Sequence, residues 1–202
     1  MWLYILQGIV YGFAAGIQPG PLQTYIISQT LAKGWRRMLP AAFAPLISDG
    51  PIIATCLLVL SQVPLWLQRF LYVAGGLFVL YLAYGAFQTW KNFDPNLPST
   101  EAGPQKNILK AAFVNILNPS PYIFWTLVTG PILLAAWRKT PAHGLGFLAG
   151  FYLTMILSLV TIILLFGTAH QLGPKVNRAL LGISAIALFC FGFYQLWLGI
   201  SI

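Results

Sequence analysis

The chain has 202 residues, of which 58% are hydrophobic, 15% are aromatic and only 7% are charged. Soluble domains carry roughly 25% charged residues, so this composition excludes a water-exposed globular protein and indicates one whose solvent is lipid. The net charge of +8 comes from Lys and Arg residues that fall between apolar runs. There they would meet anionic lipid headgroups, so we expect contact with membrane lipid and no nucleic-acid partner.

Six apolar stretches are long enough to cross a bilayer core, which takes about 20 helical residues. In chain order, we expect membrane-spanning helices over 4–30, 39–61, 68–90, 108–136, 143–168 and 179–200. None of these stretches shows the strict alternation of a β-barrel strand, so the fold class is an all-α integral membrane protein. The first apolar run follows no Lys or Arg and has no clear cleavage site, so we expect it to remain in the mature protein.

The one long polar stretch, 91–107, divides these helices into two groups of three. It contains Asp94, Glu101 and several prolines, which is typical of a linker. The expected domain organisation is therefore a first three-helix repeat over 1–90, a cytoplasmic linker over 91–107 and a second three-helix repeat over 108–202.

The placement of Lys and Arg predicts the orientation. The connections after the first, third and fifth helices hold Lys33, Arg36, Arg37, Lys91, Lys106, Lys110, Lys175 and Arg178. The remaining connections hold Arg69, Arg138 and Lys139. Because short cytoplasmic loops carry the excess of Lys and Arg, we expect both termini outside the cytoplasm of a multi-pass protein of the cell (inner) membrane.

The two halves of the chain share a motif in their first helices. The segment Gln18-Pro19-Gly20-Pro21 matches Asn118-Pro119-Ser120-Pro121 at an offset of 100. A weaker match relates 85–90 to 192–197 at an offset of 107. Three helices is an odd number, so the second half enters the membrane from the opposite side. This pattern predicts two inverted three-helix repeats with broken helices 1 and 4, an arrangement that recurs in secondary transporters.

The prolines explain the expected breaks, because each lacks an N–H and clashes with the carbonyl four residues earlier. In the first helix they would free the carbonyls of Ala15 and Ile17, and in the fourth those of Asn115 and Leu117. A new half-helix would then expose N–H groups around 22–24 and 123–125, where positive partial charge suits a carboxylate. A single proline is compatible with an ordinary kink, but two equivalent Pro-x-Pro breaks favour a substrate site.

Asp49 is the one acidic residue inside an apolar span. It lies about ten residues from the basic flank, which is roughly 15 Å at 1.5 Å per residue and close to the bilayer centre. A buried carboxylate must be neutralised by a proton or by a partner, so we expect Asp49 to exchange a proton for a substrate ammonium. The alternative is a structural acid held by Ser, Asn or backbone donors.

The expected site residues belong to the two breaks and to their polar neighbours. We expect substrate contacts from Gln18, Pro19, Gly20, Pro21, Gln23, Asp49, Asn115, Asn118, Pro119, Ser120, Pro121 and Tyr122. The polar members could instead form interhelical hydrogen bonds. No residue pattern predicts catalysis, a cofactor or a metal site. Gly8, Gly12 and Gly16 follow small-xxx-small spacing, which is typical of close helix packing or of a homodimer contact.

At these positions the chain resembles the LysE/RhtB family of amino-acid exporters. The resemblance is carried, in order, by Pro19-Gly20-Pro21, by Ile47-Ser48-Asp49 and by Leu117-Asn118-Pro119 with Tyr122. It implies a secondary transporter, not an enzyme, that exports a small solute, most often an amino acid, as an antiporter driven by protons or by the membrane potential.

Three alternatives stay open. A divalent-cation exporter could use Asp49 and backbone oxygens, although one carboxylate without nearby His or Cys is a poor site for a transition metal. An intramembrane enzyme or thiol carrier lacks a Ser–His or paired-acid arrangement, and Cys56 and Cys190 have no partner motif. A membrane scaffold without transport activity would leave the paired breaks unexplained.

Overall fold

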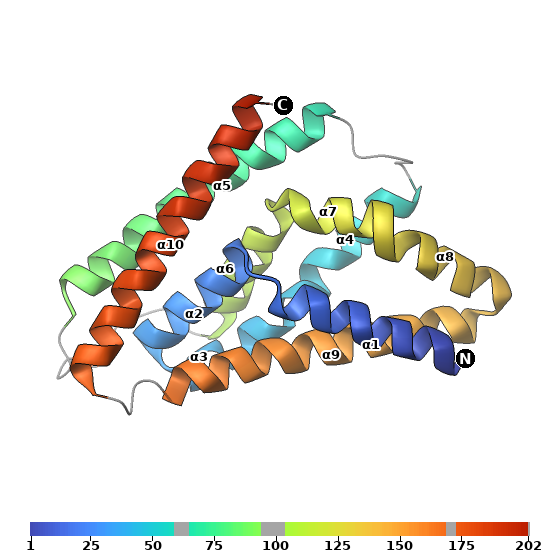
Figure 1. The fold of residues 1–202 in the computed structure, drawn as a ribbon, viewed down its shortest axis with the longest axis horizontal. Coiled ribbons are helices and arrows are strands. Elements are labelled where there is room, and N and C mark those ends of the chain that lie inside the picture. The colour runs from blue at the N-terminus through green and yellow to red at the C-terminus, as the bar shows by residue number, and fades with distance from the viewer. Residues whose placement is uncertain (59–64, 94–103, 169–172, 202) are drawn as a thin grey trace.

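The computed structural model describes residues 1–58, 65–93, 104–168 and 173–201, and these residues form helices and no strand. In chain order the elements are α1 (Trp2–Ile17), α2 (Pro21–Lys33), α3 (Trp35–Met38), the 3-10 helix η1 (Leu39–Phe43), α4 (Ala44–Leu58), α5 (Leu65–Lys91), α6 (Pro104–Ile116), α7 (Pro119–Phe124), the π-helical segment η2 (Trp125–Thr129), α8 (Gly130–Lys139), α9 (Pro141–Thr168) and α10 (Pro174–Ser201) (Figure 1). Asp94 and Glu101 of the predicted linker lie outside the described residues.

Five helical stretches of the described chain are long and apolar enough to cross a membrane. They are Trp35–Cys56, Leu65–Lys91, Pro119–Lys139, Pro141–Thr168 and Pro174–Ser201. The first predicted span, 4–30, is present as two shorter helices, α1 and α2, because the helix is interrupted between Ile17 and Pro21. The prediction of an all-helical, multi-pass membrane protein is therefore confirmed.

Helices α1 and α9 run side by side in the same direction (Figure 1). The glycines that face α9 allow this close contact, because a Cβ at Gly8 or Gly12 would overlap the backbone of Phe147 or Phe151. At Gly16 a Cβ would lie 2.7 Å from the Ser158 side chain. The small-xxx-small stripe is thus covered by α9 of the same chain. A homodimer stays a prediction, and this stripe is not free to form it.

Helices α5 and α10 form a second long pair, which is antiparallel (Figure 1). Their backbones approach closely where a Cβ at Gly76 would lie 3.0 Å from the Gly192 carbonyl oxygen. The weaker sequence match aligns Gly192 with Gly85, but no described atom lies within 4 Å of a Cβ at Gly85. The two matched glycines therefore do not play the same part in packing.

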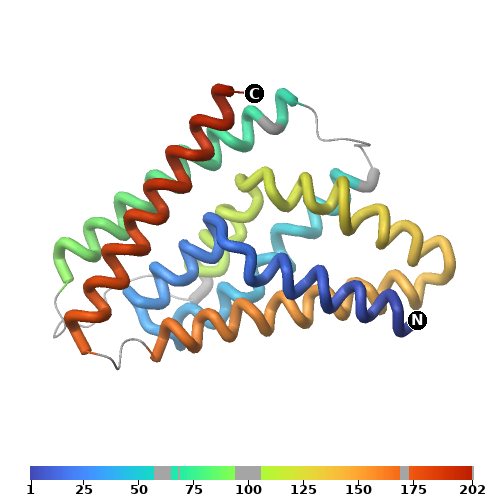
Figure 2. Tube along the Cα trace, viewed as in Figure 1, coloured from blue at the N-terminus to red at the C-terminus, as the bar shows by residue number. Residues whose placement is uncertain are grey.

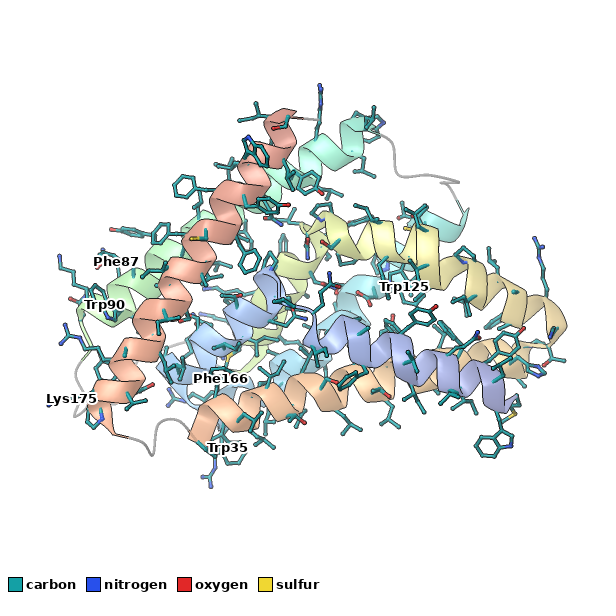
Figure 3. All side chains as sticks on the ribbon, in the orientation of Figure 1. Trp35, Phe87, Trp90, Trp125, Phe166 and Lys175 are labelled. Carbon is teal, nitrogen blue, oxygen red and sulfur yellow. The ribbon has the colours of Figure 1, made fainter. Side chains whose placement is uncertain are left out.

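Several of the cations that were expected to share one side do lie at one end of the helices. The Lys33 Nζ donates to Asn107 Oδ1 at 3.0 Å, and Asn107 Nδ2 donates to the Arg37 carbonyl at 3.1 Å. Burial lowers the pKa of Lys33, which lies beyond the predicted 4–30 span, and the nearby charges of Lys110 and Arg37 lower that pKa further. Figure 3 shows Trp35, Trp90 and Lys175 gathered at the same end. Which side of the membrane this end faces stays a prediction.

Candidate functional site

The first break joins α1 to α2. Helix α1 ends at Ile17, Gly20 is extended with φ −171° and ψ −177°, and α2 begins at Pro21. Proline suits the first position of a helix, where its missing N–H would have no partner. Figure 2 shows the chain changing direction between α1 and α2.

Gln23, in the first turn of α2, reaches back across this break. Its Nε2 donates to the Ala15 carbonyl at 3.1 Å and to the Gly16 carbonyl at 3.3 Å. The Ala15 carbonyl is one of those that the prolines were expected to free. A side-chain amide thus replaces the backbone N–H that Pro19 lacks.

The N-terminus of α2 has backbone N–H groups without a hydrogen-bond partner in the helix. Gly20 precedes the helix and has no side chain to cap it, and the Thr24 N–H donates to the Gly20 carbonyl at 3.0 Å. The N–H groups of Leu22 and Gln23 therefore have no partner within the helix. The expectation of open N–H groups over 22–24 holds for its first two residues, and it is wrong for Thr24.

The second break, between α6 and α7, is closed differently. The Asn118 N–H donates to the Asn115 carbonyl at 3.2 Å, and Asn118 Oδ1 accepts from the Ser120 N–H at 3.2 Å. Pro119 and Pro121 have no N–H to offer. The Trp125 N–H donates to the carbonyls of Pro121 and Tyr122, so the expectation of an open N–H group is wrong for Trp125. The N-cap of α7 already occupies a donor that a ligand would need.

Asp49 lies in α4 and is 2% exposed. Its Oδ1 accepts from Asn115 Nδ2 at 2.8 Å and lies 3.4 Å from the Ser48 hydroxyl, and its Oδ2 accepts from the Tyr152 hydroxyl at 3.4 Å. The Trp125 side chain is a further hydrogen-bond partner, and it lies in the interior in Figure 3. These partners come from α4, α6, α9 and η2 and are neutral, so they orient the carboxyl group without cancelling its charge.

Both breaks and Asp49 border one cavity of about 310 Å³. Most of the predicted substrate-contacting residues line it: Gln18, Pro19, Gly20, Pro21, Gln23, Asp49, Asn115, Asn118, Ser120 and Pro121. Pro119 and Tyr122 are buried but do not line it. The Tyr122 carbonyl instead accepts from the Cys56 thiol at 3.6 Å.

The remaining walls are aromatic or aliphatic and come from helices without a recognisable motif. They include Tyr72 of α5, Phe151 and Met155 of α9, and Phe191 of α10. In the sequence these residues look like any apolar helix face, so no signal marked them. Gln195 also lines the cavity, is 4% exposed, and its Oε1 has no hydrogen-bond partner among the described residues.

The chemistry of the cavity is that of a binding site for a small polar molecule. Among the described residues that line it, only Asp49 carries a formal charge. Within the described ranges, no three His, Cys, Asp or Glu side chains gather where they could hold a metal ion. The helices and this cavity define a multi-pass membrane protein with a polar site where two broken helices meet.

Comparison with known proteins gives the family. The model of the LysE type translocator family matches residues 13–199, a range that contains both breaks and Asp49. The chain belongs to this family, as its resemblance predicted, and the family is described as one of translocators. No solved structure matches the chain.

Similar proteins are named arginine exporters. The arginine exporter protein ArgO of Shigella flexneri is 29% identical over 139 residues, which is 65% of this chain and 64% of that relative. The protein of the same name from Escherichia coli (strain K12) has the same identity and coverage. The one from Klebsiella pneumoniae (strain 342) is 27% identical over the same shares. The chain thus spans 64% of the length of these curated relatives.

Proposed function

We propose that the protein is a secondary transporter of the inner membrane that exports a small solute, namely an amino acid or a similar zwitterion. The observation that carries this proposal is that both helix breaks and Asp49 line the same cavity of about 310 Å³. Membership in a translocator family and similarity to proteins named arginine exporters support it.

Two parts of the cavity lining suit the two charges of a zwitterion. The open N–H groups of Leu22 and Gln23 stand at the positive end of α2 and would receive the carboxylate. The substrate ammonium would face Asp49, which is held by neutral donors and has no cation among its hydrogen-bond partners in the described residues. An incoming ammonium supplies that positive charge.

Proton coupling is part of the proposal. Once the substrate leaves, the carboxylate of Asp49 is again a charge inside the membrane, where it must be neutralised. A proton is the smallest ion that can do this, so Asp49 would bind either a proton or the substrate ammonium. The protein would then act as an antiporter.

Movement of the two halves would expose the cavity to each side in turn. The inverted repeats predicted over 1–90 and 108–202 are part of this proposal. Helix α1 contacts α9, and in the matching pair α6 contacts α4, although much less extensively. Gly20 and Gly50 are candidate hinges. A Cβ at Gly50 would meet no described atom within 4 Å, which leaves room for movement.

The proposal is tested with purified protein in proteoliposomes, using wild type and Asp49→Asn. Wild type should exchange an amino acid in a counterflow assay and accumulate it against its gradient when a pH gradient is imposed. Asp49→Asn should lose the accumulation. Equal accumulation by both proteins would overturn the coupling role of Asp49, and absence of any amino-acid exchange by wild type would overturn the substrate class.

A further inference from the structure

Among the described residues that line the cavity, Asp49 carries the one formal charge, and Gln195 Oε1 is a buried acceptor without a partner. Together these two groups indicate which amino-acid side chain the cavity binds. The proposal below rests on the proposed function and deepens it. We propose that the cavity selects an amino acid whose side chain is uncharged and carries a hydrogen-bond donor, and that Gln195 is the residue that selects it.

Gln195 lies on α10, close to the second break. Its Oε1 lies 3.4 Å from the position that a Cβ on Gly75 would take, and the Leu117 carbonyl oxygen lies against that same position. The Leu117 carbonyl is one that the prolines of this break free. Both oxygens therefore lie near Gly75, and Gln195 Oε1 accepts no hydrogen bond from the described residues.

Turning over the side-chain amide of Gln195 would direct a hydrogen-bond donor towards the Leu117 carbonyl. The two ends of a side-chain amide have the same shape, and hydrogen-bond partners decide which end points where. If the amide of Gln195 turns over, its NH₂ group faces the Leu117 carbonyl and its oxygen faces the cavity. Gln23 already does this at the first break, where its NH₂ group donates to the Ala15 and Gly16 carbonyls. At each break, the NH₂ group of one glutamine would then donate to a backbone carbonyl, and the oxygen of that glutamine would be available to the ligand.

A buried acceptor of this kind requires a donor from the ligand. An amino acid with a carboxamide or hydroxyl side chain supplies one, and an aliphatic side chain leaves the Gln195 oxygen unpaired and desolvated. Sites built to hydrogen-bond a substrate group discriminate strongly against analogues that lack the group. Gln195 therefore favours a polar side chain over an aliphatic one.

The one negative charge in the cavity lining leaves no partner for a second cationic group on the substrate. Asp49 is the one acidic residue among the described lining residues, and the α-ammonium of the substrate already uses it. A guanidinium could stack on the aromatic walls, such as Phe124 and Phe151. That attraction is smaller than the cost of removing an unpaired cation from water. Arginine, which appears in the names of the relatives, is therefore a poor ligand for this cavity.

The test measures selectivity ratios in counterflow, with labelled glutamine, leucine and arginine in matched vesicles. Wild type should prefer glutamine over both others by about tenfold or more. Gln195→Glu supplies the missing negative charge and should raise the arginine-to-glutamine ratio by about tenfold. Gln195→Leu should lower the glutamine-to-leucine ratio by a similar factor, and Gln195→Met repeats this test in a second apolar variant.

The matched control is Gln88→Glu, the same change at the position that the sequence match pairs with Gln195. The side chain of Gln88 donates a hydrogen bond to Tyr84 and does not line the cavity. The selectivity ratios of Gln88→Glu should therefore equal those of wild type. Because each ratio is measured within one protein, differences in yield do not affect it. Preference of wild type for arginine, or unchanged ratios in the folded Gln195 variants, would overturn this inference while amino-acid transport stands. Silence of wild type towards every amino acid would overturn the proposed function itself.

Discussion

The breaks at α1–α2 and at α6–α7 start from the same Pro-x-Pro pattern and are completed in opposite ways. At the first, Gln23 donates to the carbonyls of Ala15 and Gly16 while the N–H groups of Leu22 and Gln23 stay open. At the second, Asn118 occupies an N–H of α7 while the Leu117 carbonyl rests against Gly75. The first break therefore leaves backbone N–H groups open at the start of α2, whereas at the start of α7 the Ser120 N–H is already capped. Such asymmetry suits a ligand whose two ends carry opposite charges.

Gly75→Ala should have the largest effect, because it removes the space that the second break needs. A Cβ there would overlap the Leu117 carbonyl oxygen, which is backbone and cannot turn aside. Overpacking of this kind costs about 3 kcal/mol, measured as a loss in the free energy of unfolding in detergent. Gly85→Ala on the same helix meets no described atom within 4 Å and serves as the control. Equal stability of the two variants would show that α5 and the second break do not touch.

Gln23→Leu tests the first break in the same way. The substitution leaves the buried carbonyls of Ala15 and Gly16 without their donor, which should cost about 2 kcal/mol of unfolding free energy. The control is Ile123→Leu, at the equivalent position of the second half, where a volume-conserving change should cost less than about 1 kcal/mol. A stable Gln23→Leu protein would mean that another donor satisfies these carbonyls.

Asn118→Ala should have a smaller effect, because it removes one helix cap. Loss of the bond from the Ser120 N–H to Asn118 Oδ1 should cost about 1 kcal/mol, and Asn118→Ser should restore most of it. Thermal unfolding of the three proteins side by side measures both changes. If serine rescues no better than alanine, the side chain of Asn118 does not act as a cap.

Much of this fold could be predicted from local chemistry. Length and hydropathy alone decide where long helices such as α9 and α10 lie, because lipid requires every backbone group to bond within its own helix. Proline chemistry placed both breaks within a residue or two of where α1 and α6 end. Asp49 stood out because an acid inside an apolar span is rare. Asn115 followed from its position beside the second break.

What could not be predicted is how each break is completed, since that depends on residues distant in the sequence. Gly75 and Gln195 come from helices whose patterns are simply apolar, and nothing local marks them as neighbours of Leu117. In the sequence, Trp125 and Tyr152 look like ordinary aromatic core residues. Only the fold brings the hydrogen-bond donor of each side chain to Asp49. Tyr122 was expected to contact the substrate and lies outside the cavity lining, because the turn of α7 that carries it faces Cys56.

Gly20→Ser should change stability least, and it tests the comparison most directly by giving the first break a cap like that of the second. The nearest described atom to a Cβ at Gly20 is Gln23 Oε1 at 3.5 Å, and its φ of −171° suits any residue. A serine there could accept from the open N–H groups of α2 and should add a few tenths of a kcal/mol to stability. It would also compete with the substrate carboxylate, so the half-saturation concentration should rise about tenfold, the worth of one charge-assisted hydrogen bond. Gly20→Ala adds a Cβ without an acceptor and should leave that concentration unchanged. If serine and alanine behave alike in transport, the carboxylate does not bind at α2, and the open donors of the first break have another purpose.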